Sequence, residues 1–272
     1  MAQILCSTGA LIGKPNSRDF TLLEPLAKEL NCDGFEFMLY SSWYECLDEI
    51  AKFLQEKNIY TPVMHGVKSL SEKISMGDKE NIREALEMFE VNCQFANRIG
   101  AKKFVLHLWN GMISDSNFSS NLETCGELMA IANDHGIDLL VENVVCNVED
   151  PMAHWCQLKE KYPDIHFILD TKMAAFHQQL ELIYEKEYEW LWKEGHIRHY
   201  HVNDYGGGYK EWSKLRTLPI GKGHIDFERF FEFVKMTGYA DTFTVEATAF
   251  DKEGAIDVSM LNESFQYIRE HI

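Results

Sequence analysis

The stretch Ile165-His166-Phe167-Ile168-Leu169-Asp170-Thr171 has the composition of a buried β-strand that ends on a carboxylate. Three other apolar runs of the chain end in a similar way, on Glu142, His201 and Glu246. If the four runs are parallel strands of one sheet, their last side chains lie at the same edge of that sheet. Three carboxylates and one neutral imidazole that meet there suit a divalent cation. We therefore expect a metal site at this edge.

A short apolar run followed by an amphipathic segment occurs eight times along the 272 residues. No linker or low-complexity stretch interrupts this alternation. The pattern predicts a single domain over residues 1–272 that forms a closed (β/α)8 TIM barrel of the α/β class. The expected strands are residues 2–6, 34–38, 61–65, 103–107, 138–142, 165–170, 197–201 and 242–246.

Three of the intervening segments carry helix signals. A long amphipathic segment opens near Asp78 and stops at Gly100, and Asp150 followed by Pro151 is typical of a helix start. We interpret the apolar faces of these helices as surfaces that pack on the sheet. The third segment has an apolar stripe of Phe227, Phe230, Phe231 and Val234, and it ends at Gly238.

An open, doubly wound sheet is the competing fold. It would carry a Gly-rich phosphate loop directly after its first strand. The segment Ser7-Thr8-Gly9-Ala10-Leu11-Ile12-Gly13 has two glycines, but it has neither the spacing of that loop nor a following helix start. The closed barrel is therefore the preferred fold.

The charge balance excludes some partners. The chain has 43 acidic and 26 basic residues, for a net charge of −17, and its Lys and Arg residues form no cluster. Proteins that grip nucleic acid or anionic membranes neutralise phosphates with clustered basic residues. We expect neither partner, and we expect a small-molecule substrate instead.

The N-terminal sequence and the cysteines bear on the location of the protein. No apolar stretch approaches the ~20 residues of a membrane span, and the segment Met1-Ala2-Gln3-Ile4-Leu5-Cys6 lacks the basic leader of a signal peptide. The seven cysteines are scattered and include no Cys-x-x-Cys pair, which predicts reduced, mostly buried thiols. A cytoplasmic protein is the expectation.

Other polar residues fall near the expected strand ends. Glu36 lies on the second strand, and His65 and His107 end the third and fourth. His199 shares a strand face with His201, because side chains alternate with a period of two. Each of these residues by itself could be a hydrogen-bonded structural group. Ionisable groups are costly to bury unless they have a partner or a ligand. We therefore treat these four residues together as substrate-binding candidates.

An ordered set of motifs resembles the xylose-isomerase-like barrel superfamily. Within it, the chain is most similar to the sugar phosphate isomerase/epimerase group, which includes ketose 3-epimerases, inosose dehydratases and, more distantly, metal-dependent apurinic endonucleases. No single motif is specific, but the set spans most of the chain in family order. The motifs are Asp33-Gly34-Phe35-Glu36, Val141-Glu142-Asn143, Leu169-Asp170-Thr171, His201-Val202-Asn203-Asp204, Gly221-Lys222-Gly223-His224-Ile225-Asp226-Phe227 and Val245-Glu246.

The resemblance implies that Glu142, Asp170, His201 and Glu246 hold one divalent ion, which is Mn²⁺, Mg²⁺, Co²⁺ or Zn²⁺. It also implies that Glu142 and Glu246 are the catalytic acid and base, on opposite sides of a sugar carbon. A metal that polarises a carbonyl lowers the pKa of the adjacent C–H, and a flanking carboxylate can then take the proton. We therefore expect a metal-dependent sugar (phosphate) isomerase or epimerase.

Two positions depart from the family pattern. A histidine that often follows the sixth-strand Asp by three residues is Met173 here, and an arginine six residues after the seventh-strand His is Gly207. The substrate contacts have therefore changed. Lys172 is the candidate replacement, since an ammonium beside the metal can hold a substrate oxygen or phosphate. His177 is a further substrate-binding candidate.

Alternative functions remain open. A phosphodiesterase of the apurinic-endonuclease type would use His65 and His107 as additional metal ligands, but its Asp-x-His pair falls on Leu215 and Thr217. A dehydratase of a keto-inositol would share the enolising step. A non-catalytic sugar-binding barrel would tolerate loss of a ligand, and none of the four is lost.

The oligomeric state is open as well. Four aromatic residues precede the seventh strand, and they could cover a neighbouring subunit or a substrate, or pack on the barrel. They are Tyr184, Tyr188, Trp190 and Trp192.

Overall fold

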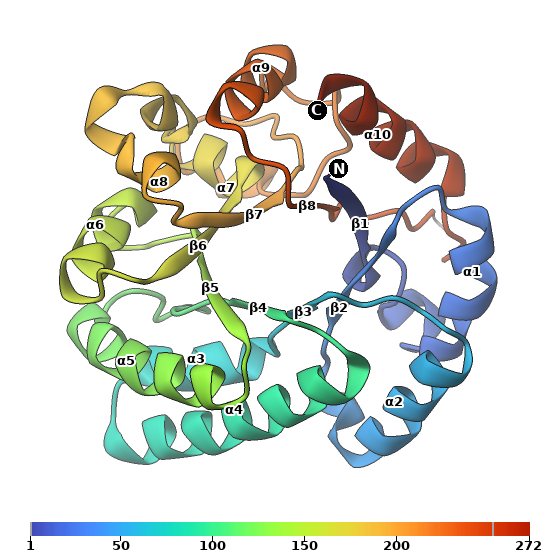
Figure 1. The fold of residues 1–272 in the computed structure, drawn as a ribbon, viewed down its shortest axis with the longest axis horizontal. Coiled ribbons are helices and arrows are strands. Elements are labelled where there is room, and N and C mark those ends of the chain that lie inside the picture. The colour runs from blue at the N-terminus through green and yellow to red at the C-terminus, as the bar shows by residue number, and fades with distance from the viewer. Residues whose placement is uncertain (1, 252) are drawn as a thin grey trace.

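A computed structural model describes residues 2–251 and 253–272, so Met1 of the N-terminal segment considered above lies outside it. Eight parallel strands follow one another in chain order, and β8 pairs with β1, with Thr242 opposite Gln3. The sheet is therefore closed, and the expected (β/α)8 barrel is confirmed (Figure 1). The strands are β1 (Gln3–Ser7), β2 (Gly34–Met38), β3 (Val63–His65), β4 (Lys103–Leu106), β5 (Asp138–Glu142), β6 (His166–Asp170), β7 (Ile197–His201) and β8 (Thr242–Val245).

Helices surround the barrel and pack on its outer surface (Figure 1). Outward-facing strand residues and inward-facing helix residues together form the main apolar core. None of the described helices is long and apolar enough to cross a membrane. The α-helices are α1 (Leu23–Glu29), α2 (Leu47–Glu56), α3 (Lys68–Met76), α4 (Lys79–Ile99), α5 (Phe118–Asp134), α6 (Pro151–Lys161), α7 (Thr171–Phe176), α8 (Trp190–Lys193), α9 (Phe227–Thr237) and α10 (Val258–His271).

The helix signals read from the sequence have identifiable physical roles. The Asp78 side chain accepts hydrogen bonds from two backbone N–H groups in the first turn of α4, and Gly100 ends this helix with a φ of 84°. Pro151 is the first residue of α6, but the Asp150 side chain does not cap it. The apolar stripe of α9 is buried, as expected, and Gly238 ends that helix in the left-handed region.

The aromatic segment before β7 is irregular. It forms two short 3-10 helices, Leu180–Tyr184 and Lys186–Tyr188, and the single turn α8. Tyr184 and Trp192 each place their rings 4.9 Å from the ring of Phe233 on α9, in edge-on geometry. All four aromatic residues of this segment are partly buried against the core, which fits packing on the barrel.

The barrel interior is layered. A buried apolar layer fills its middle and consists of Leu5, Val63, Val105, Leu140 and Ile168, one from each of five strands. Because side chains alternate along a strand, the residue two positions after each of these also points inward, one layer higher. On β5 and β6 those residues are Glu142 and Asp170. The apolar layer is thus the floor on which the polar strand ends rest.

We predict that Leu140→Ala destabilises the barrel by about 2–5 kcal/mol, because the fully buried side chain leaves a cavity that its strand neighbours cannot close. Urea unfolding followed by circular dichroism measures the change. The control is Met236→Ala on α9, where the side chain is 79% exposed and the expected change is about 0.5 kcal/mol or less. Equal destabilisation by the two substitutions would contradict the proposed role of the layer.

Candidate active site and metal centre

Three of the four strand-end residues, Glu142, Asp170 and Glu246, meet around one atom of the fourth, Nδ1 of His201. This nitrogen lies 3.4 Å from Glu142 Oε1, 3.9 Å from Asp170 Oδ2 and 3.3 Å from Glu246 Oε2. Donor atoms of Glu142, Asp170 and His201 lie within 4.8 Å of one another, and Glu246 joins this group through His201. Ligands about 2.1 Å from one ion and at right angles to each other lie about 3 Å apart. The arrangement is therefore close to that of a metal site.

Two buried atoms of this group support the same interpretation. Among the described residues, Asp170 Oδ2 and His201 Nδ1 have no hydrogen-bond partner. The other oxygen of Asp170, Oδ1, accepts a hydrogen bond from the Met173 N–H at the start of α7, so only Oδ2 remains free. Buried polar atoms without a partner are costly unless a ligand satisfies them. An oxygen- and nitrogen-binding divalent cation fits these atoms.

Two asparagines hold the backbone of Asp170 and Glu246 in place. Asn143 follows Glu142, and its side chain accepts a hydrogen bond from Asp170 N at 2.7 Å and donates one to Asp170 O at 3.0 Å. Asn203 follows His201 by two residues and accepts a hydrogen bond from Glu246 N at 2.9 Å. Each asparagine thus fixes the candidate ligand at the end of the next strand.

The glycine-rich motif supports the loop beyond Asn203. Both carboxylate oxygens of Asp204 accept backbone hydrogen bonds, from Gly223 N at 2.8 Å and from Ile225 N at 3.1 Å. A Cβ on Gly223 would lie only 2.2 Å from the Tyr205 carbonyl oxygen, so the close approach requires glycine. The motif therefore has a structural role here.

Glu36 lies beneath the candidate metal ligands and does not line the pocket. It is fully buried, and its two carboxylate oxygens accept hydrogen bonds from His201 Nε2 at 3.0 Å. His199 Nε2 donates to Glu36 Oε2 at 2.9 Å, and the Thr244 hydroxyl donates to the same oxygen. Since Glu36 binds Nε2 of His201, the other ring nitrogen, Nδ1, faces the carboxylates. This is the usual way in which a carboxylate orients a metal-binding histidine.

The carboxylates determine the charge state of His201. Burial by itself lowers the pKa of this imidazole, but Glu246, Glu36 and Glu142 raise the pKa well above its ordinary value. Burial, together with the like charges of Glu142 and Glu246, raises the pKa of Asp170 to about 6, against the opposing effect of Lys172. A metal that binds here has to displace the proton of His201, so metal binding releases protons and weakens as the pH falls.

His65 and His107 form a second cluster on Glu142. His107 Nε2 lies 2.9 Å from Glu142 Oε2, and His65 Nε2 lies 3.5 Å from the same oxygen. The two Nε2 atoms are 3.2 Å apart. Burial lowers the pKa of His107, and the nearby Lys68 ammonium adds to this effect while Glu142 opposes it. These three residues could hold a second cation.

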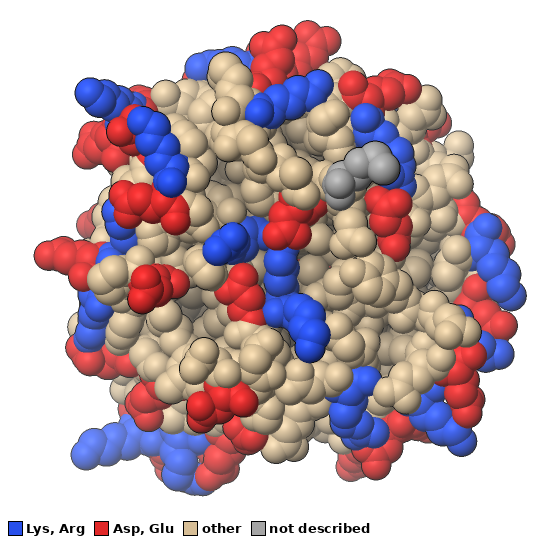
Figure 2. All heavy atoms as spheres, viewed as in Figure 1, with Lys and Arg blue, Asp and Glu red and all other residues tan. Residues whose placement is uncertain are grey.

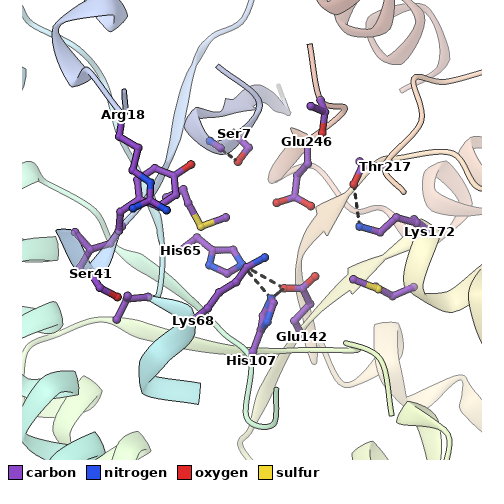
Figure 3. Close-up of a pocket in the computed structure, with 17 residues that line it drawn as sticks. Ser7, Arg18, Ser41, His65, Lys68, His107, Glu142, Lys172, Thr217 and Glu246 are labelled. Carbon is purple, nitrogen blue, oxygen red and sulfur yellow. Dashed lines mark hydrogen bonds and ion pairs between the residues drawn. The ribbon is translucent and has the colours of Figure 1, made fainter. Parts of the chain in front are cut away.

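A pocket of about 440 Å³ opens over the strand ends, and Glu142 and Glu246 line it together with both histidines (Figure 3). Lys172 also lines it, and its ammonium donates to the Thr217 hydroxyl at 3.1 Å and lies 3.6 Å from Asp170 Oδ2. Burial lowers the pKa of Lys172, but Asp170, Glu246 and Glu142 raise it above the ordinary value, so the side chain is a cation. The size of the pocket suits a monosaccharide-sized ligand.

Three of the substrate-binding candidates lie outside this pocket: Glu36, as described above, His199 and His177. His199 is buried below it, between Glu36 and the Thr242 hydroxyl. His177 accepts a hydrogen bond from Cys146 N through Nε2 at 3.2 Å, and its Nδ1 lies 2.7 Å from Asp150 Oδ1. The structure thus gives His199 and His177 hydrogen-bond partners within the protein.

Several pocket residues were not singled out from the sequence. Arg18, Tyr40, Ser41 and Lys68 line one side of the pocket, and they belong to the connections after β1, β2 and β3. A position soon after a strand end was the only available signal. Lys68, for example, follows His65 by three residues.

Comparison with known proteins places the chain in a family. A family model described as the xylose isomerase-like TIM barrel matches residues 25–271. The chain therefore belongs to the xylose isomerase-like TIM barrel family. No curated protein matches the sequence.

Solved structures of similar fold include several epimerases. A D-allulose 3-epimerase from Methylomonas sp., solved in complex with D-allulose, has a TM-score of 0.72 and 14% identity, with 100% of this chain and 97% of that chain covered. A D-tagatose 3-epimerase-like protein has a TM-score of 0.70 and 20% identity, with 98% and 97% covered. An L-ribulose 3-epimerase has a TM-score of 0.73 and 16% identity, with 100% and 94% covered. At these identities, the likeness shows the fold.

We predict that Glu36→Gln weakens Mn²⁺ binding by about 10- to 100-fold, because the neutral amide no longer favours an Nε2–H on His201 or adds negative charge behind the ring. Isothermal titration calorimetry of the metal-free protein measures the affinity. Asp33→Asn is the matched control, since Asp33 precedes the same strand but pairs with Arg269 at the surface. An affinity within twofold of the wild type in Glu36→Gln would show that Glu36 does not position the ligand.

Proposed function

We propose that the protein is a divalent-metal-dependent sugar isomerase or epimerase that moves a proton on the carbon next to a carbonyl group. The observation that carries this proposal is the placement of two carboxylates on opposite sides of the pocket, both beside Nδ1 of His201. Glu246 and Glu142 project into the pocket from β8 and β5, and they face each other across it (Figure 3). The epimerase structures of similar fold support the same class of reaction.

The two carboxylates differ in a way that suits different roles. The Glu142 side chain is 2% exposed, and His107 and His201 hold its pKa well below the ordinary value against the effect of burial. The Glu246 side chain is 14% exposed, and its Oε2 is also 3.4 Å from the Asn203 amide. We assign proton abstraction to Glu246, which is more accessible to a substrate, and proton return on the other face to Glu142.

Glu142, Asp170, His201 and Glu246 would hold the metal. When bound, the ion would polarise the substrate carbonyl and so acidify the neighbouring C–H. Lys172 donates to a substrate oxygen next to this carbon, because its ammonium already lies between Asp170 and the pocket. Return of the proton to the same carbon from the opposite face inverts that carbon. Isomerisation results instead when the proton returns to the former carbonyl carbon of the enediol and a hydroxyl proton moves to the other oxygen.

We predict that Glu246→Gln lowers the turnover rate by about 10²–10⁴-fold at saturating Mn²⁺, because the amide keeps the size of the side chain but removes its basicity. The assay follows ketose interconversion and deuterium uptake from D₂O by mass spectrometry. Glu253→Gln, an exposed change in the same loop after β8, is the control and should leave both readouts unchanged. Wild-type turnover without solvent deuterium, or an unimpaired Glu246→Gln variant, would exclude this proton transfer.

A metal-dependent phosphodiester hydrolase is the second candidate, and the cluster of His65, His107 and Glu142 is the observation that favours it. Met173 and Thr217 stand where such an enzyme needs further ligands, and both line the pocket. The charge also opposes a nucleic-acid substrate, because the net charge of the chain is −17. Figure 2 shows one end of the barrel, where acidic side chains lie beside the basic ones near the centre of the face. We therefore favour the isomerase or epimerase.

We predict no incision of an oligonucleotide duplex with a single abasic site at physiological salt and saturating Mn²⁺ or Zn²⁺, because the acidic protein repels the polyanion. Denaturing gel electrophoresis of the labelled strand provides the measurement. Incision that disappears in a His107→Ala variant would instead establish the hydrolase.

A further inference from the structure

Two cationic side chains of the pocket have no acidic partner. Arg18 and Lys68 both line the pocket, and in the described part of the chain neither lies within 4.0 Å of a carboxylate oxygen. The chain has 43 acidic and 26 basic residues, so a shortage of carboxylates does not explain why these two cations are unpaired. Lys172, the third cation of the pocket, already faces Asp170. The charges of Arg18 and Lys68 therefore remain available to a ligand.

Arg18 is held in place by an unusual backbone conformation. Ser17 and Arg18 have φ values of 58° and 55°, so two successive residues with side chains occupy the left-handed region. Arg18 N donates to Gly13 O at 2.8 Å, and the indole of Trp43 donates to Arg18 O at 3.2 Å. Left-handed residues with side chains are unfavourable, and they persist where the surrounding structure fixes them, often at binding sites.

The guanidinium of Arg18 has donors to spare. It stacks over the Tyr40 ring, 4.6 Å from the ring centre, and Nη1 donates to the Ser42 hydroxyl at 3.2 Å. The buried Nε has no hydrogen-bond partner among the described residues. A guanidinium carries five N–H groups in a planar fork that matches carboxylate and phosphate oxygens. Stacking fixes the plane of this fork and leaves most of its donors free.

The cations of the pocket lie on two opposite sides of the candidate metal ligands. Arg18 and Lys68 lie with Ser41 on one side, whereas Lys172 and Thr217 lie on the other, with Glu246 and Glu142 between them (Figure 3). A polyol whose carbonyl reaches the carboxylates therefore places one end of its chain toward Arg18 and Lys68. A neutral hydroxymethyl group does not need two cations.

We propose that Arg18 and Lys68 form a subsite for an anionic group, a phosphate monoester or a carboxylate, at the end of the polyol chain remote from the reacting carbon. This inference rests on the proposed function for the orientation of the substrate, and it names the substrate class as an acidic sugar derivative. The Arg18 guanidinium binds two oxygens of the anion. The Lys68 ammonium approaches from the side of α3 and binds the third oxygen of a phosphate, or shares one of the two oxygens of a carboxylate.

Calorimetric titration of the Mn²⁺-loaded protein tests the subsite with three compounds of one carbon skeleton. They are D-fructose, its 6-phosphate, and D-fructuronate, which carries a carboxylate at carbon 6. We expect at least one of the two anions to bind ten or more times tighter than D-fructose, since hydrogen bonds to charged groups contribute about a factor of ten or more in affinity. The comparison between the two anions distinguishes phosphate from carboxylate.

Variants connect this preference to the two residues. The double variant Arg18→Met, Lys68→Met should bind the anion and D-fructose with affinities within about twofold of each other, whereas Arg18→Lys should keep part of the preference. The control is Lys52→Met, Arg83→Met, which removes the same charge from the exposed faces of α2 and α4 and should leave the preference unchanged. Thermal unfolding and Mn²⁺ affinity establish that each variant is folded.

Two outcomes overturn the proposal. One is that neither anion binds more tightly than D-fructose. The other is that the preference persists in the double variant, which would place the anion on the metal instead. Deuterium exchange in D₂O separates this result from the proposed function: an anion preference without exchange would refute only the epimerase chemistry, and exchange with a neutral ketose without a preference would refute only the subsite.

Discussion

The burial of four carboxylates around one imidazole is the constraint on which the site depends. His201 lies between Glu36 on its Nε2 side and Glu142, Asp170 and Glu246 on its Nδ1 side. Unpaired charges of this kind are costly to bury, and a protonated His201 with Lys172 offsets only part of the negative charge. A divalent cation would supply the missing positive charge, which is why we propose a metal at this site rather than an ion-pair network.

The barrel supports this charge cluster through a column of hydrogen bonds in its interior. Lys103 donates to the Thr242 hydroxyl at 2.9 Å, this hydroxyl lies 2.6 Å from His199 Nδ1, and His199 in turn donates to Glu36. Members of the apolar layer lie beside this column: Ile168 pairs in register with His199, and Val63 with Glu36. Glu36 thus holds the Nε2 side of His201, and Nδ1 on the other side of the ring would be available to a metal. The orientation of this one imidazole would then couple Glu36 to metal binding.

The sequence predicted the framework better than the details of the site. Eight apolar runs were enough for the barrel, because alternation of strand and helix leaves few other folds. The depth of Glu36 inside the barrel could not be predicted from the sequence. Glu36 pairs in register with Val63, one layer below His65. This position depends on the stagger between neighbouring strands, which is set by closure of the sheet. Arg18 and Lys68 were missed because they belong to connecting segments, whose positions depend on tertiary packing.

The most direct test of the account is a crystal structure of the Mn²⁺-loaded protein with anomalous data collected at the manganese absorption edge. We expect a strong anomalous peak in contact with Asp170 Oδ2 and His201 Nδ1, and with one oxygen each from Glu142 and Glu246. Absence of a peak at these atoms in protein that binds manganese, or a peak held only by His65 and His107, would contradict it.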